Sequence, residues 1–314
     1  MAHSMLPEKL LTALLLLMTA AAAHALTLHV NCGKEIGLTT IGAAIKVVQS
    51  FEESRAVTVL VTGRCQENVV IQGLDRLTLT AVNGASISDA SGGKLDVISI
   101  LDSRSIAVNG FTINAGADGV SGSNGISCLE FSVCRIAGNV IQGAADGGGF
   151  LVGQSSLATL DGDMLQNNGI GLLVTSRSSV RLGGQFRQFI SRGNGRGIQM
   201  NRTAFVYVGA AVENNTDVGA AVIGNSSLVI TGSISGSGSV AVLVRESSFA
   251  RFDSATISGN AGGGVLLKDL SMGDFINGTT VTGNGGTDVV CSPQFAATRG
   301  TGSIGGGTTN CVEP

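Results

Sequence analysis

The chain has 314 residues, of which 47 are glycine, roughly twice the usual share, and only 13 % are charged, about half the usual share. The 43 % of hydrophobic residues and the formal net charge of −3 exclude a disordered chain, and the glycines follow no three-residue collagen period. The 19 Lys and Arg against 22 Asp and Glu leave no basic excess, so we predict no nucleic-acid partner.

Residues 1–25 predict a secretory signal peptide. Lys9 precedes a stretch of Leu, Ala, Met and Thr over residues 10–23, and Ala23-His24-Ala25 matches the small-x-small cleavage pattern. This stretch is too short for a membrane span, which needs about 20 apolar residues. We therefore predict a secreted protein, periplasmic or extracellular, with no transmembrane segment after cleavage.

Residues 26–55 are predicted to form an N-terminal cap. Thr40 is a suitable N-cap for a helix near residues 40–51. One face of that helix carries the apolar residues Ile41, Ala44, Ile45 and Val48. These residues would cover the first unit of the repeats that follow, because an open repeat end exposes backbone groups and core.

A repeat of 21–26 residues organises residues 56–290. Each unit has an apolar strand, a polar corner such as residues 245–248, a second apolar strand, and a short strand closed by an Asn- or Gly-rich turn. The first strands are predicted to end at Val152, Val174, Met200, Ile223, Val244 and Leu267. One unit cannot bury its own apolar face, so units stack with parallel strands about 4.8 Å apart, and asparagines at equivalent turns are expected to hydrogen-bond between units.

This pattern resembles the right-handed parallel β-helix superfamily, which includes pectate lyases, pectin methylesterases and polygalacturonases. The resemblance covers about residues 27–290. It implies an all-β fold, a single right-handed parallel β-helix (solenoid) of roughly ten coils with three short strands per coil and a short N-terminal capping helix. We predict that residues 291–314, rich in Gly and Thr, form a C-terminal capping tail.

The six cysteines all follow the predicted cleavage site. An even count in a secreted chain predicts three disulfides, for which 15 connectivities exist. Because the cysteines fall into three groups of neighbours, we predict the pairs Cys32–Cys65, Cys128–Cys134 and Cys291–Cys311. No Cys-x-x-Cys occurs and His29 is the one histidine after residue 25, so we predict no metal site.

The outward face of the first strand in each unit is predicted to be apolar. Gln199, between Ile198 and Met200, marks the outward position. The equivalent residues are Leu151, Leu173, Val222, Leu243 and Leu266. Such an apolar stripe cannot bind calcium or transfer protons, and it predicts a surface covered by the tail, a long corner or a second protein. A one-residue error in strand register is the alternative explanation.

Charged residues gather at the corner after this strand. They offer a polar binding edge made of Arg177, Arg202, Arg245, Glu246, Lys268 and Asp269. Their mixed signs and changing types favour a simpler interpretation, a solvated edge with weak ion pairs between units.

Two fragments are similar to enzyme motifs of the superfamily. Asn215-Thr216-Asp217 is similar to the Asn-Thr-Asp of polygalacturonases, but the Asp-Asp and His-Gly that follow there are missing. Asp274-Phe275-Ile276 is similar to a methylesterase segment that lacks its preceding Gly here. We interpret both as by-products of the repeat. For Tyr207, the one tyrosine, core packing is at least as good an explanation as sugar stacking.

These observations favour an exported β-helix protein with a non-enzymatic structural or glycan-binding role at the cell envelope or outside the cell, with a polysaccharide or an envelope partner and no cofactor. One alternative is a lyase, epimerase or esterase acting on acidic polysaccharide, with calcium as cofactor in the lyase case. A second alternative is a self-associating surface protein that buries the apolar stripe between copies.

Overall fold

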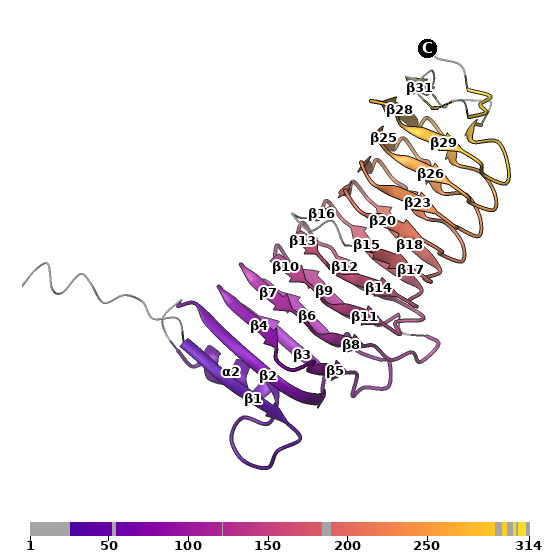
Figure 1. The fold of residues 1–314 in the computed structure, drawn as a ribbon. Coiled ribbons are helices and arrows are strands. Elements are labelled where there is room, and N and C mark those ends of the chain that lie inside the picture. The colour runs from indigo at the N-terminus through magenta and orange to yellow at the C-terminus, as the bar shows by residue number, and fades with distance from the viewer. Residues whose placement is uncertain are drawn as a thin grey trace, which may run out of the picture.

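The chain forms a parallel β-helix, an elongated rod whose coils stack along one axis (Figure 1). The computed structural model describes residues 26–51, 55–120, 122–183, 190–292, 297–299, 304–305 and 307–311. The predicted signal peptide lies outside the described residues. Within them, each regular coil passes through one strand of each of three parallel sheets, as the repeat predicts, with about nine turns in all.

The three sheets are named A, B and C. Sheet A contains β1 (Leu26–Cys32), β2 (Val57–Gln66), β4 (Leu77–Ala81), β7 (Ile106–Asn109), β10 (Val133–Ala137), β13 (Leu157–Asp161), β16 (Ser179–Leu182), β19 (Phe205–Val208), β22 (Ser227–Ile230), β25 (Phe249–Asp253), β28 (Met272–Ile276) and β31 (Ala297–Arg299). Sheet B contains β5 (Ser86–Ser88), β8 (Thr112–Asn114), β11 (Val140–Gln142), β14 (Met164–Gln166), β17 (Ile190–Arg192), β20 (Ala211–Glu213), β23 (Ser233–Ser235), β26 (Thr256–Ser258) and β29 (Thr280–Thr282). Sheet C contains β3 (Val69–Gln72), β6 (Ile98–Leu101), β9 (Ile126–Leu129), β12 (Gly148–Val152), β15 (Ile170–Thr175), β18 (Arg196–Asn201), β21 (Ala220–Val222), β24 (Val242–Val244), β27 (Val265–Leu267) and β30 (Val289–Cys291).

Strand β2 turns the corner between sheets A and B. Its first half pairs with β4 and its second half, from Arg64 to Gln66, pairs with β5. The residue pairs are in register from coil to coil, so each position in one coil stacks on the same position in the next. Side chains alternate between the interior and the outer surface along each strand.

The interior of the rod is a column of stacked apolar side chains. On sheet C the inward residues of neighbouring strands, such as Val174 and Met200, lie in register and are fully buried. Near the C-terminal end, the rings of Phe252 and Phe275 stack with centroids 4.7 Å apart. Burial of this column is the main favourable term for the fold, because no coil has a core of its own.

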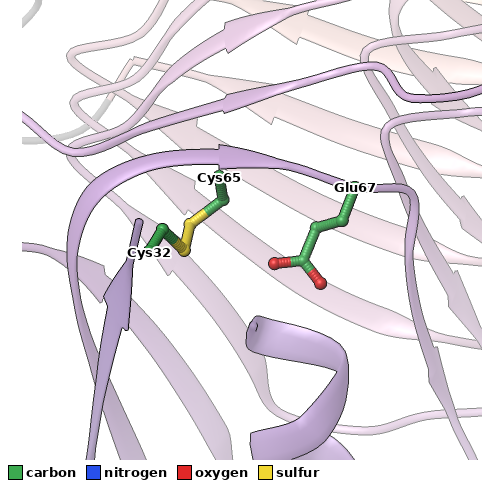
Figure 2. Close-up of side chains that lie close together, drawn as sticks. All are labelled: Cys32, Cys65 and Glu67. Carbon is green, nitrogen blue, oxygen red and sulfur yellow. A yellow bond between two sulfur atoms is a disulfide. The ribbon is translucent and has the colours of Figure 1, made fainter. Parts of the chain in front are cut away.

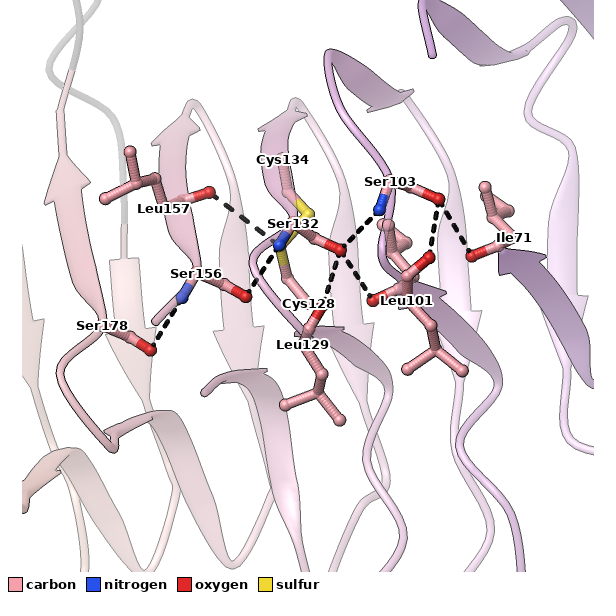
Figure 3. Close-up of a disulfide and its surroundings, with 11 residues drawn as sticks. Ile71, Leu101, Ser103, Cys128, Leu129, Ser132, Cys134, Ser156, Leu157 and Ser178 are labelled. Carbon is pink, nitrogen blue, oxygen red and sulfur yellow. Dashed lines mark hydrogen bonds between the residues drawn. A yellow bond between two sulfur atoms is a disulfide. The ribbon is translucent and has the colours of Figure 1, made fainter. Parts of the chain in front are cut away.

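Serines form a hydrogen-bonded column at the corner between sheets C and A (Figure 3). The backbone N–H of Ser103 donates to the hydroxyl of Ser132 (3.1 Å), and the N–H of Ser132 donates to the hydroxyl of Ser156 (3.1 Å). The N–H of Ser156 in turn donates to the hydroxyl of Ser178 (3.2 Å). These bonds satisfy backbone donors that the chain buries where it turns between sheets.

Asparagines form a second column at the corner between sheets B and C, as predicted. The side-chain oxygen of Asn194 accepts from both the backbone N–H (2.9 Å) and the side-chain amide (3.1 Å) of Asn168. Asn215 accepts the same two bonds from Asn194, each at 3.1 Å. Asparagine suits this place because its side chain offers a donor and an acceptor together.

The N-terminal end is closed by helix α2 (Ile41–Gln49), as predicted, with Thr40 as its N-cap. The carboxylate of Glu67 adds an unpredicted second cap, accepting from the backbone N–H of Ile41 (2.7 Å) and of Gly42 (2.9 Å). Figure 2 shows Glu67 beside the Cys32–Cys65 disulfide at this end of the rod. A carboxylate here also complements the positive end of the helix dipole.

The structure contains all three predicted disulfides, Cys32–Cys65, Cys128–Cys134 and Cys291–Cys311. The second crosses the corner between sheets C and A inside the core (Figure 3), and the third joins β30 to the tail. Three disulfides indicate an oxidising compartment outside the cytoplasm. Among the described residues, no helix is long and apolar enough to cross a membrane.

Replacing Ala204 with Ser is expected to stabilise the protein. Buried Ala204 takes the place after Ser178 in the serine column and offers no hydroxyl to the Ser178 backbone N–H, whereas Ser226 and Ser248 continue the column beyond it. One added hydrogen bond contributes about 1 kcal/mol. Urea unfolding of Ala204→Ser should show this gain, whereas the control Ala250→Ser, which buries a hydroxyl in the apolar interior, should destabilise. Equal losses in both variants would contradict the role given to the serine column.

Candidate functional site

The outer face of sheet C carries a groove across strands β15, β18, β21, β24 and β27. Two adjoining hollows of about 520 and 290 Å³ form it, and they share Arg196, Ile223 and Arg245. Half-buried Leu173 in one hollow and Leu243 and Leu266 in the other contribute an apolar surface. Part of the predicted apolar stripe therefore lines a groove.

The register of sheet C places Leu151, Leu173, Gln199, Leu243 and Leu266 in one outward column. The assignment of Val222 to this stripe is wrong. Val222 pairs with Met200 and Val244, is fully buried in the core, and leaves the column position to Ala221.

The error at Val222 is a shift of one residue in the placement of this strand. The sequence analysis took Ala221-Val222-Ile223 as the strand, whereas Ala220, Ala221 and Val222 are the residues that pair with Ile198, Gln199 and Met200. A shift of one residue reverses which side chains of a strand face inward. Ile223, predicted as the buried strand end, lies instead in the groove.

The predicted polar edge is brought together only in part. Arg202, Arg245, Glu246 and Lys268 line the groove, while Arg177 and Asp269 lie at the same corner outside the groove lining. Arg196, Asp217 and Asn201 also line it, and the sequence analysis did not assign them to this edge. Arg196 is the first residue of β18 and pairs with Ile170 of β15. The sequence analysis considered only the middle residue of each strand and therefore did not include Arg196.

The charges in the groove are unequally paired. The Nε of Arg196 lies 3.3 Å from the carboxylate of Asp217, and its Nη1 donates to the side-chain oxygen of Gln199 at 2.7 Å. The Nε of Arg245 lies 3.4 Å from the carboxylate of Glu246. Among the described residues, Arg202 and Lys268 have no ion-pair partner. The groove thus carries four cationic and two anionic side chains in a protein of net charge −3.

The two enzyme-like fragments have structural roles. Asn215 is buried in the asparagine column, and Asp217 pairs with Arg196. Phe275 stacks in the core, and the nearly buried carboxylate of Asp274 lies 3.0 Å from the Nε of Arg251. These contacts support the interpretation of both fragments as products of the repeat.

Tyr207 lies on the outer face of sheet A rather than in the core. Its hydroxyl is 3.1 Å from that of Thr231, and the guanidinium of Arg181 lies 5.6 Å from its ring centroid. Core packing was therefore the wrong interpretation of this residue. Sugar stacking at Tyr207 stays a prediction.

The strongest pKa shift among the described residues lies far from the groove. Burial raises the pKa of Asp163 to about 7, although its carboxylate accepts from the backbone N–H (2.8 Å) and side-chain amide (2.9 Å) of Asn139. Asp163 lies between β13 and β14, at the corner of sheets A and B opposite sheet C. Its shift therefore reflects a buried structural position rather than a catalytic one.

Cys32, Cys65 and Glu67 place three candidate ligand atoms within 4.8 Å of one another. The two sulfurs form a disulfide, so neither is a thiolate that binds a metal ion, and the Glu67 carboxylate is held by the helix N-terminus. The chemistry of this donor set fits a structural cap and not a metal centre (Figure 2).

Comparison with known proteins identifies the fold. No protein-family model matches the sequence, and no curated protein sequence matches it. Two similar solved structures are the A-modules of the mannuronan C-5 epimerases AlgE4 and AlgE6 from Azotobacter vinelandii, each 14 % identical to this chain. The AlgE4 module has a TM-score of 0.52, and the match covers 84 % of this chain and 87 % of that chain. The AlgE6 module has a TM-score of 0.50, and the match covers 87 % of this chain and 91 % of that chain. The GH136 lacto-N-biosidase from Eubacterium ramulus is also similar (TM-score 0.51, 10 % identity, 98 % and 70 %). The chain thus has the pectin-lyase-like β-helix fold, and at these identities the likeness extends to the fold alone.

The stability of the protein is expected to depend on pH in two opposite ways. The folded-state pKa of Asp163 is about 7 against an ordinary 3.8, so the folded state favours the protonated carboxyl group. The resulting contribution to the free energy of unfolding is fully present below about pH 4 and is lost as the pH rises to 7. For Asp89, burial raises the pKa, but hydrogen bonds from Ser91, Asn68 and Gly93 together outweigh it and lower the pKa to about 2. The contribution of Asp89 to the free energy of unfolding is present above about pH 4 and is lost as the pH falls towards 2.

Urea unfolding between pH 2 and pH 7 checks the direction of both pH dependences. In Asp163→Asn, the decline in the free energy of unfolding between about pH 4 and pH 7 should be smaller by roughly 1–3 kcal/mol. Asp89→Asn is the matched control, because it should alter only the acid arm. An unchanged slope above pH 4 in Asp163→Asn would rule out this account of Asp163.

Proposed function

We propose that this protein is an exported, non-catalytic binding protein whose sheet C groove binds an acidic glycan. The observation that carries the proposal is the surplus of cationic side chains in the groove, with Arg202 and Lys268 lacking any carboxylate partner among the described residues. Anionic groups of a ligand supply the missing partners, and guanidinium groups pair well with carboxylates.

The shape of the groove also supports a glycan. It crosses several coils and combines an apolar floor at Leu173, Leu243 and Leu266 with the amides of Gln199 and Asn201. Sugar rings present both C–H surfaces and hydroxyl groups, so such a mixed lining suits them. The fold is shared with enzymes that act on polysaccharides, which adds support by analogy only.

The chemistry of the groove favours binding over catalysis. Its two carboxylates, Asp217 and Glu246, each lie beside an arginine, and its described lining contains no histidine or tyrosine. Acid–base catalysis needs a group free to take up or release a proton at the reacting atom. Each groove carboxylate is instead paired with a neighbouring arginine.

Binding should depend on charge on both sides of the complex. Calorimetry with oligogalacturonate should show affinity that falls as NaCl rises, and the methyl-esterified form of the same oligosaccharide should bind more weakly. The double variant Arg202→Ala/Lys268→Ala should lower the affinity about tenfold.

Arg104→Ala is the matched control, because it removes one exposed arginine at an equivalent corner outside the groove. Equal binding of the esterified and free acids, or equal effects of the groove and control variants, would refute the proposal.

A polysaccharide-acting enzyme is the second candidate, and the similarity to the epimerase A-modules favours it. Incubation with pectate, methylated pectin and alginate, with and without calcium, tests it by chain length and by new unsaturated, epimerised or de-esterified residues. We expect no change in these polymers. Any modification that Arg202→Ala/Lys268→Ala abolishes would replace the binding proposal with an enzymatic one.

A further inference from the structure

Exposed apolar side chains are concentrated along one edge of the rod, next to the face that carries the sheet C groove. Eleven large hydrophobic residues are exposed among the described residues, and six of them follow the edge where sheet C turns into sheet A. We call these six the apolar strip: Phe131, Val133, Leu157, Phe205, Leu270 and Met272.

The strip is straight because the coils are in register. Val133 and Leu157 are direct neighbours on sheet A, and Phe205 and Met272 occupy the same outward column further along it. Six steps between neighbouring strands separate Val133 from Met272, a length of about 29 Å. Phe131 and Leu270 extend the strip at the two corners that precede these end strands.

Folding does not account for Phe131 and Leu270 at the two ends of the strip. Phe131 is 71 % exposed and Leu270 is 65 % exposed, so their burial contributes little. Both have a positive φ, 59° and 62°, a backbone conformation that disfavours bulky side chains, and the equivalent corner residues are polar: Ser155, Arg177, Thr203, Asn225 and Ser247. An exposed, aligned apolar surface of this kind indicates an interaction site.

Arginines flank the half of the strip that is nearer Val133. Arg135 lies beside Val133 on the outer face of β10, and Arg177 and Arg181 lie on either side of Ser179, which fills the column between Leu157 and Phe205. All three arginines are exposed, and none has an ion pair among the described residues. The carboxylates of Glu130 and Asp269 adjoin the two corner residues, and the three arginines lie in the half of the strip nearer Val133.

A hollow of about 400 Å³ opens beside the strip, with Val133, Leu157 and Ala107 in its lining and Arg135 among its residues. An apolar cavity next to an unpaired guanidinium suits a molecule that has a hydrocarbon part and an anionic head. The strip and its hollow therefore share one chemistry, apolar contact combined with anion binding.

We propose that the apolar strip docks the rod lengthwise onto a bilayer that contains anionic phospholipid. A rod touches a flat surface along a line parallel to its axis, and the strip is such a line. Apolar side chains enter the headgroup region while arginines pair with lipid phosphates, the combination that supports peripheral membrane binding. The proposal is independent of the glycan groove, since Arg202 and Lys268 take no part in it.

Vesicle co-sedimentation tests the proposal on the exported protein, checked by mass for the absence of residues 1–25. Wild-type protein should pellet with phosphatidylcholine vesicles containing phosphatidylglycerol and much less with phosphatidylcholine alone. The double variant Leu157→Ser/Phe205→Ser should lower the bound-to-free ratio at least about tenfold. Serine is already present at Ser179 and Ser227 in the same column, so the variant should fold.

Two further variants separate the contribution of the arginines from that of exposed apolar residues in general. Arg177→Ala/Arg181→Ala should remove the preference for phosphatidylglycerol, because these residues supply the charge. Ile36→Ser/Val120→Ser, which removes two residues that are exposed elsewhere, should bind as wild type does.

Three outcomes would overturn the proposal. They are absence of binding by the wild type, equal binding by Leu157→Ser/Phe205→Ser, or light scattering that shows a wild-type dimer which this variant converts to a monomer. The last result would assign the strip to a second copy of the chain. A folded variant with unaltered melting temperature is the condition for each comparison.

Discussion

Stacking of equivalent residues from coil to coil is the constraint on which the rest of this structure depends. Each strand pairs in register with its counterpart in the next coil, so any side chain at a given position meets the same position above and below it. Inward positions must then be apolar in nearly every coil, because a polar group there has no partner. The buried corners need acceptors for backbone N–H groups, and the serine and asparagine columns supply them.

The same constraint leaves the outer faces free. Outward side chains do not contribute to the core, so their chemistry can vary while the fold persists, and this is why one architecture serves unrelated functions. Here two outward regions depart from a plain polar surface. The sheet C groove is cationic over an apolar floor, and the apolar strip follows the neighbouring edge. Together they would let one rod hold a glycan on one face while an adjoining edge contacts a membrane.

Buried ionisable groups in this protein belong to the scaffold. Asp163 replaces an amide in a corner column, and its raised pKa follows from burial rather than from proximity to a ligand. The groove charges, by contrast, are solvated and weakly paired. The strongest pKa shift among the described residues and the proposed groove therefore lie on opposite sides of the rod.

The sequence by itself determined the repeat, the β-helix and the capping helix, because these depend on periodicity and on neighbours along the chain. The grouping of the cysteines favoured the three disulfides, and the structure confirmed that choice among 15 connectivities. The sequence did not determine the position of Val222, since within the apolar run of residues 220–223 a shift of one residue reverses the inward side of the strand. Nor did it assemble Arg196 with Arg245 and Lys268, or align Phe131 with Met272. Only the tertiary structure decided these, because coils stacked in register bring together residues that lie far apart in the chain.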